Sequence, residues 1–221
     1  MSGFSTARQK MVDGQVRTSD VTDSRILDAM LEVPREAFVP DDKQALAYLD
    51  LDLDVSVADG PKRYLIKPAV TAKLLQAAEI KHTDKVLVVG AATGYAAVLA
   101  ARLAGQVTAT ESDPWLAENA GTVLRQLGCA GVAVRNAPVT EGDPTGAPYD
   151  VIFLNGATEI MPQRLLGQLK DGGRLVGVFA TSQPARATLV TRSHGDFGNR
   201  TLFDAAAPVL PGLERLPAFV F

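Results

Sequence analysis

The sequence predicts an α/β fold, a mostly parallel sheet with helices on both faces, behind an N-terminal helical extension. Three observations support this. From residue 85 onward, short apolar runs alternate with helical patterns, the order of a parallel sheet with crossover helices. Before residue 53 the spacing is helical and the composition rich in charge. The 221 residues suffice for one well-cored domain, which we divide at 1–69 and 70–221.

The N-terminal region is expected to contain one amphipathic helix followed by a turn and a strand. In TSDVTDSRILDAMLEV the N-cap is Asp20 or Thr22, and the apolar face consists of Ile26, Leu27, Met30 and Leu31. The prolines of VPREAFVP end that helix. LDLDLDVSV then alternates like a strand before an Asp-Gly-Pro turn, and a further helix spans 70–80.

The later residues divide into strands and helices in turn. The expected strands are 85–90, 106–112, 131–136, 150–155 and 173–180, with helices at 95–104, 114–127 and 162–170. Gly172 and Gly173 are expected to end the last helix and start the next strand. Residues 187–193 and 199–206 would close the sheet as an antiparallel pair, and the tail from 213 would add an edge.

Composition excludes several classes of function. A formal net charge of −3 gives no electrostatic case for binding nucleic acid or an acidic membrane. The single cysteine, Cys129, rules out an internal disulfide, and with two histidines in the chain no metal site is expected. The N-terminus lacks an apolar signal region and no later segment reaches the length of a membrane span, so we expect a cytoplasmic protein.

The stretch VLVVGAATGYAAVLAARLAG, residues 86–105, has the form of a strand that enters a helix through a glycine loop. A dinucleotide loop has glycines at i, i+2 and i+5, but here Gly90 is followed by Ala92 and Tyr95, which disfavours a nicotinamide-dependent oxidoreductase. Gly90 and Gly94 fit a G-x-G-x-G loop with its middle glycine replaced. Glu111 lies 111 − 90 = 21 residues later, where an acid binds the ribose hydroxyls.

These motifs together resemble the protein-L-isoaspartate O-methyltransferases, which use S-adenosylmethionine. The resemblance runs from about Met11 to Val178. It includes MVDGQVR, VPREAFVP, AYLD and KP with its following helix, then the loop KVLVVGAATGY, and finally APYDVIFLNGA and LLGQLKDGGRLV.

The resemblance implies a Rossmann-like methyltransferase fold with a seven-stranded sheet, and methyl transfer to the free carboxylate of an isoaspartyl residue in a protein or peptide. Region 1–69 would form the substrate edge or a lid. The implied cofactor-binding residues are Gly90, Ala91, Ala92, Gly94, Tyr95, Glu111, Ser112, Ala137 and Pro138. The implied substrate-binding residues are Tyr64, Leu65, Ile66, Lys67, Asn155 and Gly156, and no metal is implied.

Several positions depart from the family pattern. Ile66 stands where the family has a serine at the reacting region, so the sequence assigns no catalytic residue. Val88 replaces an acid, Ala92 a glycine and Pro138 an aspartate that faces the adenine, which together predict weakened cofactor binding. These departures leave open a second reading, a non-catalytic relative that acts as a binding or regulatory module.

Two further features have alternative interpretations. Lys62, Arg63 and Lys67 form either a cationic lip for a carboxylate substrate or an ordinary solvated loop. Trp115 either lies along an adenine ring or anchors the start of its helix. The sequence does not determine the oligomeric state.

Overall fold

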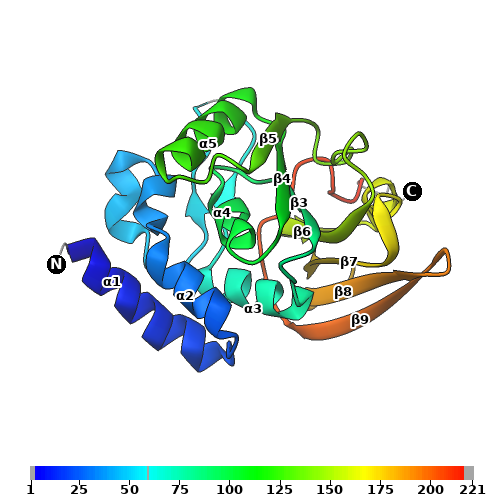
Figure 1. Cartoon of the computed structure of the whole chain (residues 1–221), viewed down its shortest axis with the longest axis horizontal. Coiled ribbons are helices and arrows are strands. Elements are labelled where there is room, and N and C mark those ends of the chain that lie inside the picture. Colours follow the sequence, from blue (N-terminus) through cyan, green and yellow to red (C-terminus); the bar gives the residue numbers. More distant parts are fainter. Residues whose placement is uncertain (1–2, 59, 217–221) are drawn as a thin grey trace, which may run out of the picture.

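A twisted seven-stranded sheet forms the centre of the computed structural model, which describes residues 3–58 and 60–216 (Figure 1). The strand order is β5-β4-β3-β6-β7-β8-β9, in which β5 to β7 run parallel and the last two strands are antiparallel. The strands are β3 (Lys85–Val89), β4 (Gln106–Glu111), β5 (Ala133–Asn136), β6 (Tyr149–Thr158), β7 (Leu169–Phe179), β8 (Arg186–Ser193) and β9 (Asp196–Asp204). This confirms the Rossmann-like fold with a mostly parallel sheet.

Helical turns and one short hairpin precede the sheet, and longer helices connect its strands. The first part contains α1 (Gly3–Met11), η1 (Val12–Val16), η2 (Arg17–Ser19), α2 (Ser24–Glu32), η3 (Arg35–Phe38), η4 (Asp41–Leu46) and the hairpin β1 (Leu53–Asp54) with β2 (Tyr64–Leu65). The remaining helices are α3 (Pro68–Ala78), α4 (Tyr95–Ala101), α5 (Pro114–Gln126) and α6 (Gln163–Leu166).

The amphipathic helix begins later than the sequence analysis expected. Its N-cap is Asp23, whose carboxylate accepts a hydrogen bond from the Arg25 backbone N–H. The expectation of Asp20 or Thr22 was therefore wrong. Asp20 lies in the left-handed region at φ 62°, and the Thr22 N–H is bonded to the Gln76 side chain, so the chain is still turning there.

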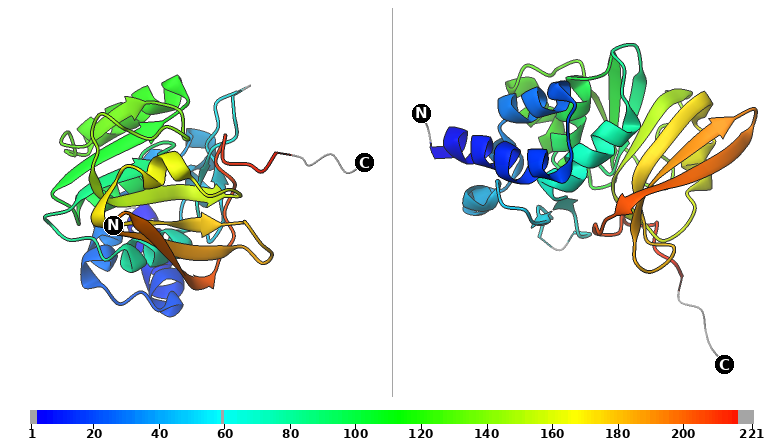
Figure 2. Two further views of the ribbon diagram at one scale, coloured as in Figure 1. Left: turned by 90° about the vertical axis from the view of Figure 1, so that its right-hand side faces the viewer. Right: turned by 90° about the horizontal axis from the view of Figure 1, so that it is seen from below.

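The two faces of the sheet are covered unequally. Val86 and Val88 of β3 face a core shared with α3, α4 and the N-terminal helices, which lie together on one side in Figure 2. The alternate residues Leu87 and Val89 belong to a second cluster on the other face. There the cover comes from the short α6 and from residues 205–216, which we call the C-terminal strap and which buries Leu210 and Leu213.

The end of the sheet differs from expectation in two respects. Gly172 and Gly173 lie inside β7, which begins at Leu169, so they do not end a helix, and the helix expected over 162–170 shortens to α6. A register shift in the β6–β7 pairing accommodates them.

The strap pairs with β6 through one parallel bridge between Ala157 and Val209. Residues 217–221 of the expected edge lie outside the described residues.

None of the helices in the described ranges is long and apolar enough to cross a membrane. Within the same ranges, no group of three or more His, Cys, Asp or Glu side chains could hold a metal ion.

The Asp143 carboxylate is expected to contribute a pH-dependent part of the stability. Burial opposes its ionisation, but hydrogen bonds from Tyr149 (2.5 Å) and Thr145 (2.7 Å) outweigh that and lower its pKa below 3.8. A carboxyl group with a lowered pKa in the folded chain stabilises above its unfolded pKa, and this contribution is lost as the pH falls through the folded value. Asp143→Asn should therefore lower the free energy of unfolding by about 1–2 kcal/mol at neutral pH.

Urea unfolding at a series of pH values checks this prediction. The difference from wild type should begin to shrink below about pH 4, where Asp143 of the unfolded chain takes up a proton. It should disappear as the pH falls through the lower pKa of Asp143 in the folded chain. Asp28→Asn, which changes an exposed carboxylate on α2, is the matched control. A difference that stays constant from neutral to acidic pH would contradict the assignment.

Candidate functional site

The candidate site lies at the carboxyl ends of β3, β4 and β6, where the strand order changes direction and such folds bind ligands. The loop after β3 turns through three left-handed positions, Gly90 (φ 71°), Ala92 (φ 51°) and Gly94 (φ 99°). The Gly90 and Ala91 N–H groups both donate to Thr110 O at 2.9 Å, which ties the loop to β4. Ala92 thus keeps the backbone of the glycine it replaces, at a cost of about 1–2 kcal/mol.

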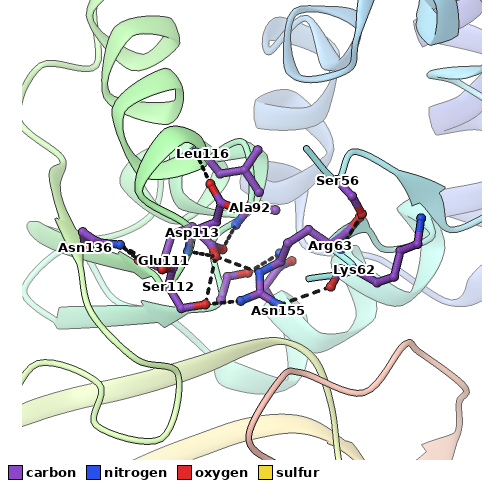
Figure 3. Close-up of polar contacts among 11 residues, drawn as sticks. Ser56, Lys62, Arg63, Ala92, Glu111, Ser112, Asp113, Leu116, Asn136 and Asn155 are labelled. Atoms are coloured by element: carbon purple, nitrogen blue, oxygen red, sulfur yellow. Dashed lines mark hydrogen bonds and ion pairs between the residues drawn. The ribbon is translucent and has the colours of Figure 1, made fainter. Parts of the chain in front are cut away.

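Glu111 ends β4 and is fully buried, with its carboxylate pointing at this loop (Figure 3). Its Oε2 accepts a hydrogen bond from the Ala92 N–H at 2.7 Å. Its Oε1 accepts one from the Asp113 N–H at 3.0 Å, while the Asp113 side chain caps α5 through Leu116. The carboxylate predicted to bind ribose hydroxyls is therefore positioned by the loop and by the start of the next helix.

Arg63 contacts the same carboxylate from the β1–β2 hairpin. Its Nε donates to Glu111 Oε1 at 2.7 Å, and its Nη2 donates to Ser112 Oγ. The side chains of this ion pair are 2% and 0% exposed. Arg63 is thus neither a solvated loop residue nor part of an exposed cationic lip, so both interpretations of this residue were wrong. The physical reason is the buried negative charge of Glu111, which requires a partner.

Little free space remains beside the loop. A cavity of about 10 Å³ is lined by Tyr64, Ile66, Gly90 and Asn155, with Lys62, Arg63 and the strap residues Pro208, Val209 and Leu210 completing it. That is room for about one water molecule. Leu210 approaches both Gly90 and Gly156 so closely that a Cβ on either would lie within 3 Å of its side chain.

Whether S-adenosylmethionine fits therefore depends on two side chains. The loop backbone and the Glu111 carboxylate suit a nucleoside, because they offer close backbone approach and an acceptor for ribose hydroxyls. Arg63 is bonded to the Glu111 carboxylate, and Leu210 lies against Gly90 at the start of the loop. The cavity of about 10 Å³ is too small for the cofactor in this conformation, so side chains that line it have to move before it can bind.

Several other expected site residues lie around the same loop. Asn155 is buried, and its Nδ2 donates to Gly90 O at 2.9 Å, so its amide holds the loop. The Ala137 N–H donates to Glu111 O at 3.0 Å, which brings the end of β5 beside β4, and Pro138 follows it exposed. Tyr95 is buried and packs against Phe38 and Arg35.

The remaining candidates divide between core and surface. Leu65 and Ile66 are buried, while Tyr64 and Lys67 are partly exposed. Trp115 is 57% exposed at the start of α5. Its interpretation as an adenine contact stays a prediction.

Comparison with known proteins decides the family. The model of the protein-L-isoaspartate (D-aspartate) O-methyltransferases matches residues 6–202. The chain belongs to this family. Protein-L-isoaspartate O-methyltransferase 1 of Rhodopseudomonas palustris strain HaA2 is 37% identical over 196 residues, covering 88% of this chain and 78% of that protein. Protein-L-isoaspartate O-methyltransferase 1 of Syntrophobacter fumaroxidans is 38% identical over 176 residues, covering 80% of each.

Solved structures of the family share the fold. A protein-L-isoaspartate O-methyltransferase superimposes with a TM-score of 0.82 at 24% identity, over 94% of this chain and 67% of that one. A putative enzyme of the same name from Plasmodium falciparum, in complex with S-adenosyl-L-homocysteine, gives a TM-score of 0.77 at 17% identity, over 92% and 97%.

Two residues that shape the site were not identified as such from the sequence. Arg63 lies within the family match, but its pairing with Glu111 joins residues 48 positions apart. Leu210 lies beyond the match, which ends at residue 202. Hydrophobic periodicity does not indicate that an arginine will be buried beside a predicted ribose-binding acid. The strap contains no sequence motif that would identify it. The paired left-handed glycines and the acid were identifiable because their spacing follows from one βα unit.

Proposed function

We propose that this chain is an S-adenosylmethionine-dependent carboxyl methyltransferase that methylates the free carboxylate of isoaspartyl residues in proteins or peptides. The observation that carries the proposal is the family match through residues 6–202, which contains the hairpin, the loop and Glu111. Relatives at 35–38% identity carry the name protein-L-isoaspartate O-methyltransferase. The cofactor supplies an electrophilic methyl group when bound.

The chain's own contribution to such a reaction is positioning. An isoaspartyl carboxylate is ionised at neutral pH, so it needs no general base to become a nucleophile. Holding it in line and excluding water supplies most of the rate. The partly exposed Tyr64, on β2 and next to the loop, is the residue we assign to this task.

Transfer of a labelled methyl group to a synthetic isoaspartyl peptide tests the proposal. The matched control is the same peptide with a normal aspartyl linkage, which should remain unlabelled. Transfer to the isoaspartyl peptide alone would support the activity. Absence of transfer to either peptide by protein that binds S-adenosylhomocysteine would reject it and favour the binding-module alternative.

The side chain at position 66 is expected to limit this activity. Ile66 is 2% exposed and stands where the family has a hydroxyl. Ile66→Ser should raise kcat/KM for the isoaspartyl peptide by about two- to tenfold, the worth of one hydrogen bond. Steady-state kinetics of the labelled transfer measure it.

Ile66→Ala is the matched control, because it opens similar space without adding a hydroxyl. If Ile66→Ala raises kcat/KM as much as Ile66→Ser, the gain comes from space, and the role assigned to the hydroxyl is wrong.

A cytoplasmic location, the role of residues 1–69 as a substrate edge or lid, and the identity of the protein substrates stay predictions from the sequence. The same holds for the division at residue 69, although Met11 and Val12 belong to one buried cluster with Val86 and Val88 of the sheet.

A further inference from the structure

The proposed cofactor needs the Glu111 carboxylate as a hydrogen-bond acceptor. The guanidinium of Arg63 is already bonded to that carboxylate. Oε1 of Glu111 accepts hydrogen bonds from Arg63 Nε at 2.7 Å and from the Asp113 N–H at 3.0 Å, and Oε2 accepts one from the Ala92 N–H at 2.7 Å. A carboxylate has about four acceptor positions. With these three in use, and a longer contact from Ser112 Oγ to Oε1 at 3.5 Å, it cannot also accept from both hydroxyls of a ribose.

Further hydrogen bonds hold the Arg63 guanidinium at this position. A second contact joins its Nη2 to Ser112 Oγ, and its Nη1 donates to Lys62 O at 3.3 Å. The backbone beneath it is also fixed, because the Arg63 N–H donates to Ser56 Oγ at 2.9 Å and the Val55 N–H donates to Arg63 O at 2.9 Å. Figure 3 shows the side chain reaching from the hairpin to the end of β4.

The cavity beside the loop is too small for a nucleoside. The remaining cavity of about 10 Å³ is bounded by Leu210, which lies against Gly90 and Gly156. The strap that carries Leu210 is held by its own backbone bonds, with the Ala157 N–H donating to Pro208 O and the Leu210 N–H donating to Ala157 O, both at 2.8 Å. The closed arrangement is therefore made by two separate elements, of which Arg63 alone contacts the ribose-binding carboxylate.

We propose that Arg63 is an internal competitor of the cofactor, a side chain that holds the ribose position of Glu111 until S-adenosylmethionine or its demethylated product displaces it. This inference rests on the proposed function for the identity of the ligand. The apparent affinity for the cofactor then equals the affinity of the open form multiplied by the fraction of molecules in which Arg63 has left the pocket.

Calorimetric titration with S-adenosylhomocysteine tests the proposal on three proteins, namely wild type, Arg63→Gln and Arg102→Gln. Removing the competitor should lower the dissociation constant by at least about tenfold. Arg102→Gln removes one cation at the far end of α4, where the side chain is 44% exposed, and should leave the dissociation constant unchanged. Equal or weaker binding by Arg63→Gln than by wild type would overturn the proposal.

A second measurement covers the case in which Arg63→Gln fails to fold. In wild type, the Nε–H of Arg63 is buried and hydrogen-bonded, so its NMR signal should be protected from exchange with water. Titration with S-adenosylhomocysteine should abolish that protection. A signal that remains protected at saturating ligand would show that Arg63 and the ligand bind together, and would also overturn the proposal.

The outcomes separate this inference from the proposed function. If Arg63→Gln binds no better than wild type while wild type methylates the isoaspartyl peptide, the competitor role alone is wrong. If Arg63→Gln binds tightly while wild type transfers no methyl group, the competitor role stands and the activity is wrong. If none of the three proteins binds S-adenosylhomocysteine, both the competitor role and the proposed activity are wrong.

Discussion

Glu111→Ala should lower the free energy of unfolding by about 3–5 kcal/mol, because it leaves the guanidinium of Arg63 buried without its counter-charge. Both side chains are almost completely buried, so water cannot replace the lost partner. The same substitution removes the acceptor assigned to the ribose hydroxyls and should abolish measurable binding of S-adenosylhomocysteine. Urea unfolding and calorimetry measure the two effects separately.

A double variant tells whether the loss comes from the unpaired charge. Arg63→Met combined with Glu111→Leu replaces the pair by apolar side chains of similar size, an exchange that is often neutral or stabilising in other proteins. The double variant should therefore be more stable than Glu111→Ala alone. If it is less stable, the cost arises from the contacts of Glu111 with the Ala92 and Asp113 N–H groups, and the charge argument fails.

Arg35→Ala should lower the free energy of unfolding by about 3–5 kcal/mol. Arg35 is fully buried, and it donates to Ala47 O at 2.8 Å and to Ile66 O at 2.9 Å. Its guanidinium also lies 4.7 Å from the centre of the Tyr95 ring. The substitution leaves a cavity and two buried carbonyl groups without donors, which explains the size of the expected loss.

Thermal and urea unfolding of Arg35→Ala measure the loss, with Arg102→Ala as the control. Arg102 is partly exposed and its contact with Glu32 is 3.8 Å long, so its removal should cost less than about 1 kcal/mol. Similar losses in both variants would mean that Arg35 acts only through general charge. Because Arg35 holds the backbone of Ile66, its loss should also loosen the hairpin that carries Arg63.

The sequence was sufficient for most of the sheet because its signals are local. The buried strand β3 and the central parts of β6 and β7 are apolar runs that can be recognised in the sequence, and the expected antiparallel pair at 187–193 and 199–206 corresponds to β8 and β9. Errors occurred where tertiary contacts set a boundary. Gly172 and Gly173 lie inside β7 at a register shift instead of ending a helix, and Gln76 from α3 holds the turn that precedes α2.

The sequence by itself determined the fold class, the family, and the loop with its acid, because these depend on residue types at fixed spacing within one strand–loop–helix unit. Only the tertiary structure decided which side chains lie against Gly90 and Glu111. Arg63 reaches Glu111 from a hairpin 48 residues upstream, and Leu210 reaches Gly90 from a strap 120 residues downstream (210 − 90 = 120). Their side chains meet the loop because a buried carboxylate requires a cation and an uncovered sheet face requires apolar cover. The hydrophobic periodicity of the sequence indicates neither of these two requirements.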